Sequence, residues 1–240
     1  MNRAPYKKWW FIAAAAIVGL ACIGGCVSRY FGLPQRDCRD HLIENGIVYE
    51  KPCGAKGEPV ERDPRWAWPV QDRPGLPNLF RVTPDFYRGA QPAPEGLEEL
   101  SKLGIKTIIN LRTSHDDLED IKKMGVEFNY IHLPFNTMSP EFEDVVAFLK
   151  VFQDDNNLPL FLHCRRGADR TGMMTAAYRM VYDGWTVDEA IEEMARGGYR
   201  YNAFWRNLKH YLRKLDLEKV QRALEDSKEL TQDSPQEKEK

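Results

Sequence analysis

The chain has 240 residues, a net charge of −2 at pH 7 and 42% hydrophobic residues. This length suits one catalytic domain with additional segments, and the slight negative charge gives no sign of the basic surface that a nucleic-acid partner requires. The five histidines show no metal-ligand spacing, so we expect neither a metal nor another cofactor.

The first segment in chain order is an uncharged apolar run at residues 9–27, which follows a basic flank at residues 1–8. The run is long enough to span a membrane, and the basic flank predicts that residues 1–8 stay in the cytoplasm. Ile23-Gly24-Gly25-Cys26 resembles a lipobox, the signal that precedes a lipidated cysteine. A transmembrane anchor, a lipoprotein signal and a cleaved signal peptide therefore remain alternatives. All three place the rest of the chain on the periplasmic or cell-surface side.

Residues 28–78 are expected to form an extracytoplasmic linker. Asn45-Gly46 lies between apolar flanks, which is typical of a two-residue hairpin turn. If that turn forms, Glu44 faces Ile47, and the same register continued outward brings Cys38 opposite Cys53. A disulfide can bridge such a pair in an oxidising compartment. Two unrelated free thiols are the alternative.

The linker ends in a proline-rich stretch between Pro59 and Pro77, which also contains Trp66 and Trp68. Closely spaced prolines exclude a helix or a central strand. The stretch is therefore expected to be an extended connector. Its tryptophans favour a strap packed on the domain surface over a site for a partner protein.

Residues 79–217 show apolar strands that alternate with amphipathic helices, and residues 218–240 form a helix end and a charged tail. Ser139 and Pro140 are typical of a helix start. The pattern predicts an α/β fold with a mostly parallel central sheet flanked by helices. The expected strands are 80–82, 86–88, 107–111, 129–133 and 158–162, and the expected helices lie around 97–103, 116–124, 139–152, 173–182, 186–195 and 203–224.

The most informative stretch is His163-Cys164-Arg165-Arg166-Gly167-Ala168-Asp169-Arg170-Thr171-Gly172, between an expected strand and an expected helix. Loop amides and the positive end of a helix dipole converge at such a junction and bind anions. The same field favours the thiolate of Cys164, and Arg170 offers a planar fork to two phosphate oxygens. These residues predict attack of a thiolate on a bound phosphoryl group.

This stretch resembles the signature of the cysteine-dependent protein tyrosine and dual-specificity phosphatases, His-Cys-x-x-Gly-x-x-Arg-Ser/Thr-Gly. The similarity extends weakly over residues 79–217, through Tyr87–Pro92, Gly104–Arg112 and Tyr178–Ala190, and is closest to the compact bacterial and atypical dual-specificity branch. The resemblance implies that Cys164 is the nucleophile and that Arg170 binds phosphate. It implies that Thr171 donates a hydrogen bond to the Cys164 sulfur and so helps this sulfur to leave in the second step. It also implies that His163 supports the loop structurally. Substrate-binding positions by the same resemblance are Arg165, Arg166, Gly167, Ala168 and Thr171.

The proton donor is not evident from the sequence. Members of this family usually place an aspartate in a loop before the cysteine, where this chain has Asn136, and an asparagine cannot supply a proton. Glu141, Glu143 and Asp144 lie nearby at a helix start. We assign the role to Asp169, because similar inositide-type phosphatases place an aspartate just before the arginine.

We therefore expect a phosphatase that hydrolyses phosphate monoesters through a cysteinyl-phosphate intermediate. Arg165 and Arg166 favour a polyanionic substrate. The candidate substrates are a phosphoprotein, an inositol phosphate, a sugar phosphate or a phospholipid headgroup. If no acid is present, the alternative is a catalytically weak pseudophosphatase that binds phosphate or acts as a scaffold.

Overall fold

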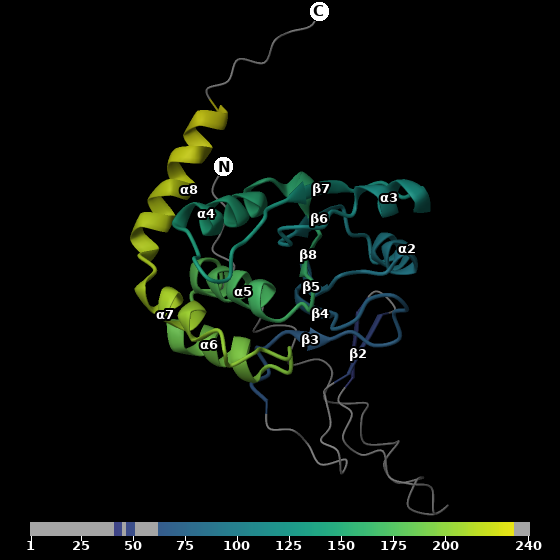
Figure 1. The fold of residues 1–240 in the computed structure, drawn as a ribbon, viewed down its shortest axis with the longest axis horizontal. Coiled ribbons are helices and arrows are strands. Elements are labelled where there is room, and N and C mark those ends of the chain that lie inside the picture. The colour runs from purple at the N-terminus through teal and green to yellow at the C-terminus, as the bar shows by residue number, and fades with distance from the viewer. Residues whose placement is uncertain (1–40, 45–46, 51–61, 233–240) are drawn as a thin grey trace, which may run out of the picture. The chain divides into compact units, whose positions relative to one another are not determined.

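The computed structural model describes residues 41–44, 47–50 and 62–232 (Figure 1). The short hairpin consists of β1 (His41–Glu44) and β2 (Ile47–Glu50), which pair antiparallel. Glu44 pairs with Ile47, which is the register expected from an Asn45-Gly46 turn. Cys38 and Cys53 lie outside the described residues, so their disulfide stays a prediction.

The main sheet has six strands in the order β3-β4-β5-β8-β6-β7. Pairs β5/β8, β8/β6 and β6/β7 are parallel, whereas β3/β4 and β4/β5 are antiparallel. The expectation of a mostly parallel sheet is therefore wrong, and the sheet is mixed. The reason is that only a tight turn joins β4 to β5, and parallel strands need a much longer crossover. The strands are β3 (Trp68–Pro69), β4 (Phe80–Thr83), β5 (Phe86–Ala90), β6 (Thr107–Asn110), β7 (Asn129–His132) and β8 (Leu160–Cys164).

Helices cover both faces of this sheet, as the strand pattern predicts. Leu160 and Leu162 of β8 belong to one buried cluster, and Phe161 between them belongs to the other. In Figure 1, α2 and α3 lie on one side of the sheet and α4 and α5 on the other. The helices are α2 (Pro94–Lys102), α3 (Leu118–Met124), α4 (Phe142–Lys150), α5 (Asp169–Val181), α6 (Val187–Arg196), α7 (Arg206–Lys214) and α8 (Leu217–Gln232), with short 3-10 turns η3 (Val151–Gln153) and η4 (Asp155–Asn157).

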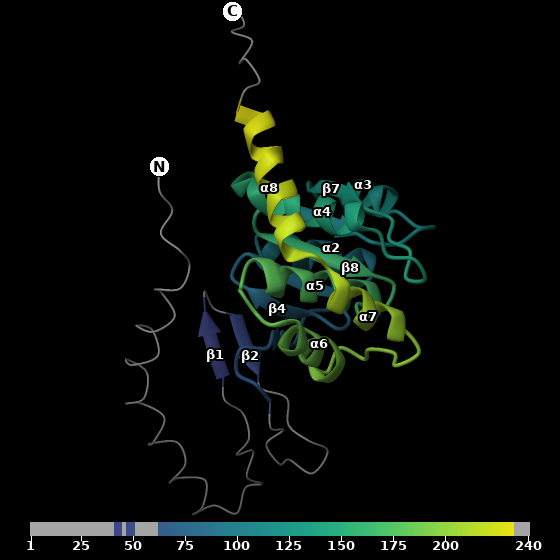
Figure 2. The same ribbon diagram turned by 90° about the vertical axis from the view of Figure 1, so that its left-hand side faces the viewer.

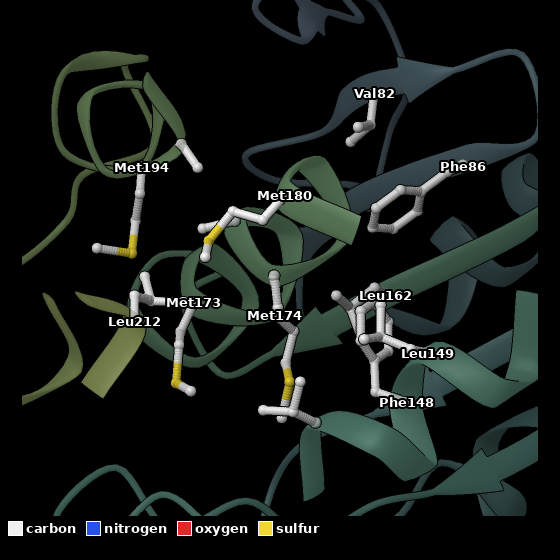
Figure 3. Close-up of a cluster of buried hydrophobic side chains, with 14 of the residues drawn as sticks. Val82, Phe86, Phe148, Leu149, Leu162, Met173, Met174, Met180, Met194 and Leu212 are labelled. Carbon is white, nitrogen blue, oxygen red and sulfur yellow. The ribbon is translucent and has the colours of Figure 1, made fainter. Parts of the chain in front are cut away.

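Helix α5 is buried along most of its length. Figure 3 shows Met173, Met174 and Met180 of this helix, and Met194 of α6, among the apolar side chains of the larger cluster. Unbranched methionines adapt to irregular gaps, so they pack a helix tightly without demanding one exact neighbour shape. The start of α5 is consequently held in place by the core.

Two helices differ from the expectation. Helix α4 begins at Phe142 rather than at Ser139, because Glu141 is its cap residue and its amide donates to Asp144 Oδ2 at 3.3 Å. The single helix expected at 203–224 is divided into α7 and α8. Leu215 is extended with ψ 119°, and Asp216 Oδ1 accepts from the Lys219 amide at 3.0 Å, which caps a new helix.

Helix α8 continues beyond Leu224 to Gln232, further than the charged composition predicts. Val220 and Leu224 are buried in the larger cluster, and the Leu224 carbonyl accepts from Gln153 Nε2 at 2.9 Å. Figure 2 shows α8 running past α4 and α5, which it contacts. Tertiary packing on one face therefore stabilises a helix whose other side is polar.

Residues 62–78, which we call the strap, pack on the domain. Trp66 is buried in the larger cluster and Trp68 packs against the smaller one. The Val70 amide donates to the Leu79 carbonyl at 3.0 Å, which continues the pairing of the two-residue strand β3. The tryptophans thus serve the domain itself, as favoured from the sequence.

Within the described ranges no helix is both long and apolar enough to cross a membrane. The apolar run predicted as an anchor, residues 9–27, lies outside these ranges.

Candidate active site

The site is built at the end of the central strand. Cys164 is the last residue of β8, which lies between β5 and β6, and Asp169 is the first residue of α5. We call residues 164–170 the Cys164 loop. Carboxyl ends of parallel strands form the edge at which α/β proteins bind ligands. Cys164 is nearly buried, with 4% of its surface exposed.

Gly167 allows the loop to lie against β5. Its φ is +65°, in the left-handed region, and a Cβ atom there would lie 2.3 Å from the carbonyl carbon and oxygen of Gly89. The loop backbone thus approaches β5 closely at Gly167, and its positive φ suits a residue without a Cβ atom. No other residue fits this position without moving the loop.

Buried polar atoms without a hydrogen-bond partner gather at this loop. In the described part of the chain they include two nitrogens of Arg88 and single atoms of His163, Arg170 and Thr171. Buried polar groups are normally satisfied, so a cluster of exceptions indicates a place for a polar ligand. The arginine nitrogens among them are donors, which suit an anion. Thr171 Oγ1 makes no hydrogen bond to the Cys164 sulfur here, in contrast to the role implied by the resemblance.

His163 is fully buried and is held by Asp117, a residue that the sequence pattern placed only at a helix start. The His163 Nε2 and Asp117 Oδ2 atoms lie 2.8 Å apart, and Gln91 Nε2 donates to Asp117 Oδ1 at 2.5 Å. Burial raises the pKa of Asp117, but the hydrogen bond and charge of His163 outweigh it, so this pKa lies below its ordinary value. The ionised carboxylate fixes the ring beside Cys164. No local pattern marks Asp117, because it reaches His163 only through the fold.

Arg165 and Arg166 are exposed at the outer side of the loop. The Arg166 carbonyl accepts from Asn78 Nδ2 at 2.9 Å, and the same amide nitrogen donates to the Tyr199 carbonyl at 3.2 Å. Asn78 thereby joins the loop to the segment before α7.

The acids considered as proton donors, and Asn136 at the position where the family usually has an aspartate, differ in position. Asp169 lies in the Cys164 loop, and its Oδ1 accepts from the Asn202 amide at 2.8 Å. Asn136 Oδ1 accepts from the Met138 amide at 3.0 Å and so stabilises a turn. Asp144 Oδ2 accepts from the Glu141 amide at 3.3 Å and so caps the start of α4. Among these candidates, only Asp169 is within the loop that carries the cysteine.

Arg170 follows Asp169 in the first turn of α5 and is half-buried. Its side chain therefore starts from the first turn of α5, where the backbone amides have no partner within the helix. The structure brings Cys164, Asp169 and Arg170 into one loop at the carboxyl edge of the sheet.

Comparisons with known proteins agree with this geometry. Residues 79–209 match the family described as DSP-PTPase phosphatase fused to NAD+ kinase. The dual specificity protein phosphatase TpbA of Pseudomonas aeruginosa strain UCBPP-PA14 is 28% identical over 225 residues, covering 93% of this chain and 88% of the relative. The inositol diphosphatase DSP5 of Arabidopsis thaliana is 28% identical over 123 residues, covering 49% of this chain and 60% of the relative.

A crystal structure of P. aeruginosa TpbA aligns with a TM-score of 0.60 and 30% identity, covering 68% of this chain and 99% of that chain. A second structure of that protein is a complex with phosphotyrosine. With the signature loop, these matches identify the chemistry of the domain. The chain belongs to the dual-specificity branch of the protein tyrosine phosphatases and is a cysteine-dependent phosphatase.

Proposed function

We propose that the chain hydrolyses phosphate monoesters through a cysteinyl-phosphate on Cys164, with aryl phosphates such as phosphotyrosine as substrates. The observation that carries this proposal is the Cys164 loop, with a nucleophile at one end, Arg170 at the other and α5 beginning between them. Loop amides and the amino end of α5 supply a field for a phosphate dianion. Arg170 adds a forked pair of donors.

The reaction has two displacements. The Cys164 thiolate attacks phosphorus, an S–P bond forms, and the bond from phosphorus to the ester oxygen breaks. The leaving oxygen takes a proton from Asp169 or water. Water then attacks the phosphocysteine and gives its proton back to Asp169 or to solvent, the S–P bond breaks, and the sulfur leaves as thiolate while inorganic phosphate departs. Arg170 gains most in the transition states, where charge shifts to the equatorial oxygens.

An aromatic substrate is supported by the surroundings of the loop. Met138 and Phe204 are each 77% exposed, which is unusual for large apolar side chains. Asn207 Nδ2 donates to the Met138 carbonyl at 3.3 Å, so the two segments that carry Met138 and Phe204 are adjacent. Asn202 joins the second segment to Asp169. An aryl group beside a bound phosphate would find apolar contacts there, and the relative TpbA was solved with phosphotyrosine.

A second candidate substrate is an inositol phosphate. The exposed Arg165 and Arg166 favour a polyanion, and one relative is named an inositol diphosphatase. Activity of the full chain on inositol phosphates that exceeds its activity on phosphotyrosine peptides would favour this candidate.

The donor role of Asp169 predicts a substrate-dependent defect. Asp169→Asn keeps an oxygen that can accept from the Asn202 amide but cannot supply a proton. We expect hydrolysis of a phosphoserine peptide to slow by about two to four orders of magnitude, and hydrolysis of p-nitrophenyl phosphate to slow far less, because only a poor leaving group needs the acid. Steady-state rates of the full chain on both substrates measure this difference.

Asp169→Ala is the matched control, since it also removes the acceptor for Asn202. If Asp169→Asn slows both substrates equally, Asp169 only positions the segment before α7. Glu141 and Asp144 would then be the next residues to test, and water the remaining donor.

We also propose that residues 9–27 anchor the protein in a membrane, through a helix or a lipidated Cys26, and that residues 28–240 lie outside the cytoplasm. The support is the apolar run with its basic flank. A phosphatase reporter that is active only outside the cytoplasm, fused after Lys240, should be active. Activity of a cytosol-only reporter at the same position would refute the topology. Mass mapping of protein from that compartment should find Cys38 and Cys53 joined.

A further inference from the structure

Arg88 is a fully buried arginine in the middle of β5, directly beneath the Cys164 loop. Its Nη2 donates to the Gly167 carbonyl oxygen at 2.7 Å. Its Cζ atom lies over the Tyr199 ring, 3.8 Å from the ring centre. An arginine whose exposed fraction is 0% is costly to bury, so its position calls for a specific explanation.

The Tyr199 ring is itself held in place through its hydroxyl group. Its hydroxyl donates to Glu193 Oε1 at 2.8 Å, and Glu193 also accepts from Arg179 Nε at 2.8 Å and from the Ala67 amide at 2.7 Å. Ala67 belongs to the strap. The ring that supports Arg88 is therefore locked by a buried carboxylate and by a segment distant in sequence.

No carboxylate in the described part of the chain accepts a hydrogen bond from Arg88. Glu193, the acid below it, is already paired with Arg179, and the remaining Arg88 nitrogens, Nε and Nη1, have no partner there. Burial lowers the pKa of Arg88, whereas Tyr199, Glu193 and Cys164 act in the opposite direction. An arginine stays protonated in proteins, so a positive charge lies beneath the loop.

The contact with Gly167 also orients the loop. A carbonyl oxygen that faced a bound phosphate would repel it. The Gly167 carbonyl instead points to Arg88, and the left-handed φ at Gly167 makes this orientation accessible. Successive amides in such a turn can then face an anion. The buried positive charge of Arg88 and the orientation of the Gly167 carbonyl therefore both favour the binding of a phosphate at the loop.

We propose that Arg88 is a positioning residue for catalysis, which holds the Gly167 carbonyl away from the substrate phosphate and places a buried positive charge behind the loop. It acts through Gly167 and does not touch the substrate. The inference rests on the proposed function, because it assigns Arg88 to the phosphate site of that same loop.

The test compares Arg88→Met with Arg88→Lys in the full chain. Arg88→Met removes the donor and the charge. We expect inorganic phosphate and vanadate to inhibit about tenfold less tightly, and kcat/KM for p-nitrophenyl phosphate to fall about 100-fold, because a loop no longer oriented through Gly167 misplaces amide donors, and one such donor is worth about that factor. Arg88→Lys keeps a charge and one donor, so it should recover part of both losses. Tyr199→Leu, which removes the supporting ring, should shift inhibition in the same direction as Arg88→Met.

Arg73→Met is the matched control, since Arg73 is a partly buried arginine that donates to Glu99 Oε2 on α2 at 2.9 Å and belongs neither to the Cys164 loop nor to the contacts that fix Tyr199. It should lower the melting temperature yet leave the inhibition constants of the folded protein unchanged. The proposal is overturned if Arg88→Met melts lower but binds phosphate and vanadate as the parent does, or if Arg73→Met weakens inhibition equally. Retained vanadate binding without any hydrolysis by the parent chain would refute the proposed function and leave the Arg88 comparison intact.

Discussion

Cys164→Ser should reduce the hydrolysis of p-nitrophenyl phosphate by about 10⁵-fold or more, because a serine hydroxyl in the same place is a far weaker nucleophile than a thiolate. The substitution exchanges one atom at a nearly buried position, so the loop and the sheet edge stay as they are. Initial rates of the full chain, with the parent measured alongside, determine the loss.

The same variant should still bind phosphate and vanadate, since the amides, Arg170 and Arg88 remain. Binding is measured by the change in intrinsic tryptophan fluorescence or by calorimetry. Replacement of Cys38 and Cys53 together by serine, which leaves neither cysteine of the proposed disulfide unpaired, tests whether loss of sulfur elsewhere affects turnover. Undiminished activity of Cys164→Ser would end the assignment of the nucleophile.

Arg170→Lys should lower kcat by roughly 10²–10³-fold although the formal charge is kept. A lysine presents a single ammonium group, whereas the guanidinium group offers two parallel donors to the equatorial oxygens, and those contacts strengthen in the transition state. KM should rise as well, because ground-state phosphate binding uses the same fork. Steady-state kinetics of the full chain separate the two parameters.

Arg196→Lys provides the matched control for this change. Arg196 lies on α6 and forms a surface ion pair with Glu192 at 2.8 Å, so its replacement should leave both kinetic parameters near those of the parent. An Arg170→Lys protein with the parent kcat would show that Arg170 supports the loop without binding the transferred phosphoryl group.

Much of the architecture follows from local patterns. The sequence predicts a strand before Cys164 because a continuous apolar run is typical of a buried strand. It predicts a helix after Cys164 because residues 173–182 show a helical pattern. The expected strand at 158–162 occurs two positions later, at Leu160–Cys164, because Pro159 has no amide hydrogen to donate to a ladder. Only three residues separate the expected strands 80–82 and 86–88, which is too few for a parallel crossover, so the sequence did carry the signal of an antiparallel pair and hence of a mixed sheet.

Part of the candidate site also follows from the sequence alone, and part of it does not. The sequence by itself singled out Cys164, Gly167 and Arg170 as candidates, because these residues are neighbours in one loop and the expected chemistry depends on that spacing. It left the proton donor as a choice between nearby acids.

Only the tertiary structure decided what holds the loop. Arg88 reaches Gly167 from β5, Asp117 reaches His163 from the start of α3, and Ala67 of the strap reaches Glu193 on α6. Each of these contacts joins residues far apart in the chain. Their partners are set by strand order and helix packing, and such long-range pairings leave no periodicity in a single sequence.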